Sequence, residues 1–84
     1  MDDHIISKAL IDLTFIYHTK KQITFLDIFE ILKRYSMHDI MDEEFVKKLA
    51  TSLLNNVNFK KACQNSNFTE MKHLIKLNFL SLIR

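Results

Sequence analysis

The chain has 84 residues, of which 48% are hydrophobic, and a formal net charge of +2. This length predicts one domain, residues 1–84, and the hydrophobic content excludes a disordered chain. A single cysteine, Cys63, excludes an internal disulfide, and the histidines show no zinc-ligand spacing. Small folds without such cross-links often gain stability by oligomerisation. We therefore expect a second copy or a permanent partner to complete the fold.

The sequence contains no glycine and no proline. Tight turns and β-hairpins depend on these two residues, so their absence favours helices joined by polar loops. We predict an all-α fold, a compact bundle of four to five short helices completed by oligomerisation. The acidic start, Met1-Asp2-Asp3, does not resemble a signal peptide, and no apolar run reaches the roughly 18 residues of a membrane span. These features predict a cytoplasmic protein without a transmembrane segment.

The first predicted helix runs from about Asp3 to Tyr17, followed by a polar break at 18–22. Its apolar residues follow the three- and four-residue spacing of one helical face. They are Ile5, Ile6, Ala9, Leu10, Leu13, Ile16 and Tyr17. Ile11 and Phe15 lie outside that face and widen the apolar arc. We therefore expect this helix to contact more than one neighbour.

The second predicted helix begins at Thr24, a residue type that suits an N-cap. Asp27, three residues later, forms a weak version of the capping box with it. Glu30 and Arg34 have the spacing of a favourable ion pair on one helical face. These features predict a helix with a defined start and a charged outer surface.

The third predicted helix follows a connector at 36–41, and its cap is either Asp39 or Asp42. Its apolar stripe is the most regular in the chain. The stripe consists of Val46, Leu49, Ala50, Leu53, Leu54 and Val57. Glu43 and Lys47 form an i,i+4 pair in the favourable order.

Asparagines mark the ends of the following helices. Asn55, Asn56 and Asn58 stand where the third helix should end. Asn tolerates the left-handed conformation that ends helices in a chain without glycine. A short helix is then predicted over 59–64, and Asn67 is the predicted cap of the last helix. The inward residues of the short helix are predicted to be Phe59, Ala62 and Cys63.

The segment 74–83 is the most apolar in the chain, and its apolar residues do not stay on one face. Ile75, Leu77 and Phe79 alternate with polar residues as in a strand, but length and the lack of turn residues favour a helix over 68–83. So small a chain has too little surface to cover a helix that is apolar all round. We predict that this segment contributes to the core and also forms an interface with a second copy or another protein. A central core helix of the monomer is an alternative, and a membrane-surface anchor is less favoured because the polar face is thin. The candidate interface residues are Leu74, Ile75, Leu77, Phe79, Leu80, Leu82 and Ile83.

Four adjacent pairs of basic residues form the candidate nucleic-acid contact. They are Lys20, Lys21, Lys33, Arg34, Lys47, Lys48, Lys60 and Lys61. The second and third helices could form a helix-turn-helix. However, the connector lacks glycine, and the third helix opens with the acidic run 42–44, which would repel phosphate. We therefore predict that these basic side chains are simply exposed to solvent, and nucleic-acid binding is the alternative.

Catalytic signatures are absent from the sequence. The four histidines lie in separate segments; only His38 and Asp42 have metal-like spacing, and they fall at a polar connector. Cys63 is not part of a known cysteine-enzyme motif, and we predict that it is a small buried apolar residue. A glycine-rich loop that could bind phosphate is excluded, because the sequence contains no glycine. We predict a non-enzymatic protein-interaction or regulatory module, a homodimer, with no metal, cofactor or small-molecule substrate. The first alternative is a small helical nucleic-acid-binding regulator.

Two families show a general resemblance. Ala9-Leu10 to Leu13, Ile23 to Leu32 and the acidic start before Phe45 resemble the small enterobacterial connector proteins that regulate biofilm and acid resistance, which are short helical dimers. The glycine and Leu-Glu positions of that family are missing, so no function is carried over. The size, basic character and helical pattern also resemble bacteriocin immunity proteins, which gives a further alternative.

Overall fold

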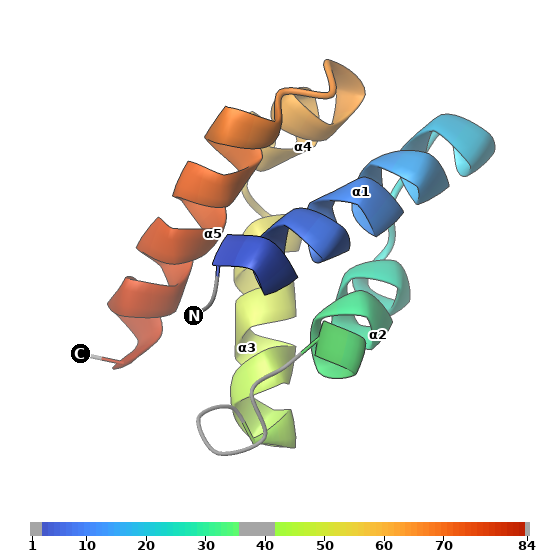
Figure 1. The fold of residues 1–84 in the computed structure, drawn as a ribbon. Helices are drawn as coiled ribbons and strands as arrows, with labels where there is room; N and C mark the ends of the chain where they lie inside the picture. The colour runs from blue at the N-terminus through green and yellow to red at the C-terminus, as the bar shows by residue number, and fades with distance from the viewer. Residues whose placement is uncertain (1–2, 36–41, 84) are drawn as a thin grey trace.

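The computed structural model describes residues 3–35 and 42–83, which fold into five α-helices (Figure 1). The helices are α1 (Asp3–Lys20), α2 (Phe25–Tyr35), α3 (Glu43–Leu54), α4 (Val57–Gln64) and α5 (Phe68–Ile83). The predicted all-α bundle is confirmed. The helix predicted over 68–83 is confirmed too, and no strand occurs in these two ranges. Completion by oligomerisation stays a prediction.

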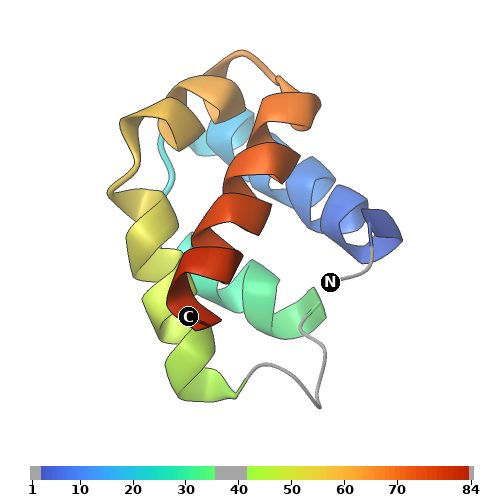
Figure 2. The same cartoon turned by 90° about the vertical axis from the view of Figure 1, so that its left-hand side faces the viewer.

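The helices are arranged around two that do not pack on each other, α1 and α3. Each of α2, α4 and α5 contacts both of them, and α4 also contacts α5. Figures 1 and 2 show α5 running along one side of the bundle, with α1 crossing near its first half. The expectation that the first helix contacts more than one neighbour is confirmed, because α1 packs on α2, α4 and α5.

One apolar cluster forms the core and draws on all five helices. Its fully buried members are Leu13, Ile28, Leu49, Ala50, Leu53, Phe59, Cys63 and Met71. The inward residues predicted for α4 are confirmed, since all three are buried. The side chains that define the core therefore follow the helical spacing visible in the sequence.

The start of α2 is a complete capping box. The Thr24 hydroxyl accepts from the Asp27 backbone N–H at 3.2 Å, and the Asp27 carboxylate accepts from the Thr24 N–H at 2.9 Å. The Lys20 ammonium lies 2.9 Å from the same carboxylate. Burial raises the pKa of Asp27, but the hydrogen bonds from Lys20 and Thr24 outweigh burial and leave its pKa below the usual value. The predicted box is confirmed, and it also ties the end of α1 to α2.

Three further helices begin at side-chain caps. Asp42 accepts from a backbone N–H of the first turn of α3 at 2.8 Å, which identifies it as the cap. The other candidate, Asp39, lies outside the described residues, as does the predicted connector 36–41. Asn56 caps α4 at 3.0 Å, and Asn67 accepts from the Glu70 N–H of α5 at 3.2 Å, as predicted for that residue.

The helix ends differ from the sequence-based expectation. Asn55, which follows α3, has a φ of −85°, so its predicted left-handed conformation is wrong. Positive φ occurs instead at Lys21 (61°) and Ser66 (53°), which follow α1 and α4. These two residues accept a conformation that glycine would adopt at lower cost.

Two helix boundaries also differ. α1 continues to Lys20 instead of ending at Tyr17, and α4 begins at Val57 instead of Phe59. The prediction that Val57 belongs to the stripe of the third helix is wrong. Asn56 caps a new helix after α3 has ended, and the change of direction leaves Val57 exposed.

The face assignment of α3 predicts unequal effects for two alanine substitutions. Leu53→Ala removes a fully buried side chain and should lower the free energy of unfolding by about 2–4 kcal/mol. Lys47→Ala removes an exposed side chain with one ion pair to Glu43 at 3.8 Å and should change it by less than about 0.5 kcal/mol. Urea denaturation followed by circular dichroism measures both, and equal effects would contradict the assignment.

Candidate functional site

The seven residues predicted as an interface divide into core and surface. Leu74 and Ile75 are buried in the core, and Phe79 and Leu82 are half-buried against it. The exposed side chains are Leu77 (49%), Leu80 (47%) and Ile83 (54%). We call these three residues the α5 stripe. The exposed part of the predicted interface is therefore limited to one side of the second half of α5.

The α5 stripe is exposed because α1 covers only the first part of α5. Asp3, the first residue of α1, pairs with Lys76 at 2.7 Å, and α5 continues beyond this point to Ile83 (Figure 1). The hydrogen bond and the charge of Lys76 lower the pKa of Asp3. Where α5 faces α3, the Phe79 ring packs edge-on against the Phe45 ring, with the ring centroids 5.3 Å apart. One side of this segment is thus held by the fold, and the other side is open.

A second apolar surface lies where α1 meets the start of α5. Ile11 and Phe15 project from α1 and are each 58% exposed, and Phe68 of α5 is 44% exposed. Sequence reasoning placed no binding residues here. The signal was present, because Ile11 and Phe15 lie four residues apart and outside the main apolar face of their helix. What the sequence did not reveal is that Phe68 of a distant helix lies beside Ile11, whereas Phe15 lines a different hollow.

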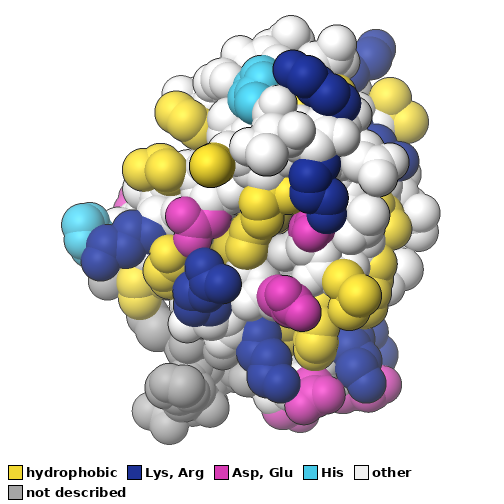
Figure 3. Space-filling view, turned by 90° about the vertical axis from the view of Figure 1, so that its right-hand side faces the viewer, with side chains coloured by type: hydrophobic (Ala, Val, Ile, Leu, Met, Phe, Trp, Pro, Cys, Tyr) yellow, Lys and Arg dark blue, Asp and Glu magenta, His cyan; other side chains and the backbone are white. Residues whose placement is uncertain are grey.

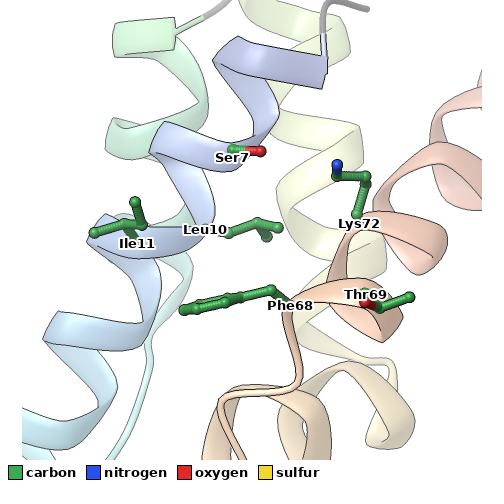
Figure 4. Close-up of a pocket in the computed structure, with 6 residues that line it drawn as sticks. All are labelled: Ser7, Leu10, Ile11, Phe68, Thr69 and Lys72. Atoms are coloured by element: carbon green, nitrogen blue, oxygen red, sulfur yellow. The ribbon is translucent and has the colours of Figure 1, made fainter.

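Ile11 and Phe68 form the walls of a hollow of about 220 Å³ between α1 and α5, which we call the α1–α5 groove. Its lining residues are Ser7, Leu10, Ile11, Phe68, Thr69 and Lys72. Figure 4 shows Leu10 and Phe68 pointing from opposite helices into the same space, with the Lys72 ammonium and the Ser7 hydroxyl at one end. The groove is therefore apolar in the middle and polar at one end, and no acidic residue lines it.

Another hollow, of about 350 Å³, lies between α1 and α2. Its lining residues are Asp12, Phe15, Ile16, Thr19, Lys20 and Arg34. The Asp12 carboxylate accepts from the Tyr35 hydroxyl at 2.7 Å and lies 3.4 Å from the Arg34 guanidinium. The hydrogen bond to Asp12, with burial, raises the pKa of Tyr35. Arg34 thus pairs with Asp12, and the predicted pair with Glu30 is wrong. The charges of this hollow already have internal partners.

The predicted nucleic-acid residues do not share one helix or face. They lie at the end of α1 and on α2, α3 and α4. Four of them stand within 4 Å of an acidic side chain, namely Lys20, Lys33, Arg34 and Lys47. On the side of the molecule that carries α2, Figure 3 shows basic side chains interleaved with acidic ones. Such a mixed face differs from the continuous basic stripe that binds phosphates.

Residues that could bind a metal ion or act as a nucleophile are few in the described part of the chain. Within residues 3–35 and 42–83, no group of three or more His, Cys, Asp or Glu residues is placed to hold a metal ion. His38, one member of the candidate metal pair, lies outside these ranges. Cys63 is buried as predicted, and burial raises the pKa of its thiol to about 11. None of the described helices has both the length and the apolar character needed to cross a membrane.

No protein-family model, curated protein or solved structure matches this chain. The resemblances to connector proteins and to bacteriocin immunity proteins therefore gain no support.

The burial of Cys63 predicts a thiol that reacts only when the protein opens. Thiolate is the reactive form, and a pKa of about 11 leaves very little of it at pH 8. Alkylation by iodoacetamide at pH 8 should be about a hundredfold slower in the native protein than in urea. Mass spectrometry of timed samples measures both rates. Similar rates in the two states would contradict the burial of this side chain.

Proposed function

We propose that the protein is a non-enzymatic interaction module that forms a homodimer through the α5 stripe. The observation that carries this proposal is the exposure of Leu77, Leu80 and Ile83 on a helix whose other side belongs to the core. Contiguous apolar side chains at a surface favour burial against another apolar surface. A module of this kind acts by bringing proteins together and needs no catalytic group.

The spacing of the α5 stripe suits a second copy of the same helix. Leu77 and Ile83 lie three residues on either side of Leu80. In an antiparallel pair related by a two-fold axis at Leu80, Leu77 of each copy meets Ile83 of the other. A two-fold interface must be self-complementary, and this spacing meets that condition.

The size of the stripe sets the expected strength of the dimer. Stable complexes bury about 800 Å² from each partner, whereas the whole chain exposes 5208 Å². Three half-exposed side chains supply only part of this area, so neighbouring residues of α5 must contribute. We therefore expect a dissociable dimer with a dissociation constant in the micromolar range.

Substitution at the centre of the stripe tests the dimer. Leu80→Glu should shift the protein to monomer, because a two-fold axis at this residue brings two carboxylates together. Leu26→Glu is the matched control, since Leu26 is 60% exposed on α2, outside the stripe. Sedimentation velocity from about 1 to 500 µM measures the dissociation constant. A wild-type protein that stays monomeric throughout, or equal effects of the two variants, would overturn the proposal.

The alternative function is nucleic-acid binding through the lysines without acidic partners. In the described ranges, Lys21, Lys48, Lys60 and Lys61 form no ion pair. If these residues bind phosphates, affinity for a DNA duplex should fall steeply with salt, because bound counterions are released. Fluorescence anisotropy at salt concentrations from about 50 to about 200 mM measures how steeply the affinity for DNA falls. No binding at the lowest salt would remove this alternative.

A further inference from the structure

We propose that one end of the bundle, formed by α4 and the last turn of α1, binds duplex DNA, with the outward side of α4 in the major groove. We call this surface the α4 end. The proposal rests on the nucleic-acid alternative above and assigns that alternative to one surface. It is independent of the α5 stripe, because α4 precedes the first residue of α5, whereas the stripe lies in the last turns of that helix.

The helices α3 and α4 are joined as in a helix-turn-helix. Only Asn55 and Asn56 separate them, and Figure 2 shows α4 crossing the end of α3. In such a pair, the second helix lies in the major groove and the first crosses the DNA backbone. The eight residues of α4 span about 12 Å, which suits a groove about 12 Å wide. The second helix of this pair is α4, whereas the sequence suggested a pair of α2 and α3.

The position of α4 in the bundle leaves one of its sides free to meet DNA. Its inward residues Phe59, Ala62 and Cys63 are buried, and the helix packs on α1, α3 and α5. The other side faces solvent. Its exposed residues are Val57, Asn58, Lys60, Lys61 and Gln64.

The exposed side of α4 carries side chains that suit the edges of bases. Asn58, Lys61 and Gln64 follow one another at intervals of three residues, so they lie along one side of the helix. In the major groove, Asn and Gln amides bond to adenine, and Lys bonds to guanine. An apolar side chain such as Val57 suits the methyl group of thymine. The exposed side of α4 therefore has the composition of a helix that reads bases.

The α4 end carries basic residues and no acidic ones. Asp and Glu are absent from 13–26 and from 45–69, the stretches that contain the last part of α1 and all of α4. Within the described ranges, Lys21, Lys60 and Lys61 form no ion pair. In Figure 3, basic and histidine side chains occupy the upper end, where α1 terminates, and the acidic side chains lie lower. A basic surface of this kind attracts phosphate.

The acidic residues next to these stretches leave the α4 end positive. The run 42–44 lies at the start of α3, about 18 Å along the helix axis from α4. This distance exceeds the screening length of about 10 Å at 0.1 M salt. Asp27 is paired with Lys20 at 2.9 Å, and Glu70 lies in the first turn of α5, where the helix dipole offsets its charge. The phosphate repulsion expected at the start of α3 therefore does not apply to α4.

The last turn of α1 lies beside α4 and can supply phosphate contacts. α1 packs on α4, and Nε2 of His18 lies 3.0 Å from the hydroxyl of Ser66 in the loop after α4. Lys21 follows directly after α1 and is exposed. Phosphate contacts fix the orientation of a protein on the duplex, while base contacts determine the sequence that it prefers. The α4 end thus combines both kinds of contact from two distant segments of the chain.

Two substitutions with the same change of charge test the location of the site. Lys61→Glu should weaken binding to a fluorescein-labelled duplex of about 20 base pairs about tenfold and lower the slope of log affinity against log salt by about 1. Lys8→Glu is the matched control, because Lys8 is exposed in the first half of α1, about 15 Å along that helix from His18. It should change the affinity by less than about twofold. Fluorescence anisotropy measures both affinities, and circular dichroism checks that each variant folds.

Selection from a pool of duplexes of random sequence tests the contact with bases. The wild-type protein should enrich a common sequence. Asn58→Ala should lower the discrimination at one base pair of that sequence about tenfold. Methylation of guanine N7, which projects into the major groove, should weaken binding to the enriched duplex at least about tenfold.

Several results would overturn the proposal in distinguishable ways. Equal losses for Lys61→Glu and Lys8→Glu would overturn the assignment to the α4 end and leave the nucleic-acid alternative in place. A pool without enrichment, or binding that tolerates N7 methylation, would overturn the insertion of α4 into the major groove. Tighter binding of polyglutamate than of DNA would identify an acidic protein as the partner instead. No binding of DNA at about 50 mM salt would overturn both the alternative function and this surface, whereas the homodimer is decided separately by sedimentation of Leu80→Glu.

Discussion

The contact between α5 and α3 determines which side of α5 is buried in the core. Met71, Leu74 and Ile75 of α5 join the buried residues of α3 in the core. A polar contact sets the register of the two helices, because the Asn78 side-chain carbonyl accepts from the Ser52 hydroxyl. The Asn78 amide also donates to the Leu74 carbonyl at 2.7 Å, which holds this side chain in place. Both side chains are half-buried, so sliding α5 along α3 would break this hydrogen bond and would be unfavourable.

This contact determines which apolar residues remain at the surface. α5 carries more apolar side chains than one contact can bury, and α1 reaches only as far as the pair between Asp3 and Lys76. A larger protein would place such a helix at its centre, but five short helices cannot surround it. The α5 stripe and the α1–α5 groove are two consequences of the same shortage of covering surface. Small size therefore explains why apolar side chains stay exposed on a helix whose other side belongs to the core.

The sequence predicted features within a helix better than it predicted contacts between helices. The capping box at Thr24 and the inward side of α4 follow from spacing and hydrogen-bonding capacity within a few residues. Val57 was wrongly assigned to α3 because the apolar spacing continues past Asn56, where α3 has ended and α4 begins. Arg34 was assigned to a partner on its own helix, whereas its acid comes from α1. The groove likewise depends on a contact between segments distant in sequence, which periodicity does not encode.

The acidic side chains of this protein have structural roles that several of its lysines lack. The acidic side chains hold the helices in place: Asp27 completes the capping box at Thr24, Asp42 caps α3, and Asp12 joins α1 to α2. Several lysines have no such role and keep their charge exposed. Each surface ion pair contributes at most about 1 kcal/mol, so pairing alone would not bind a partner tightly. Burial of apolar side chains would therefore supply most of the binding free energy at any interface with another protein.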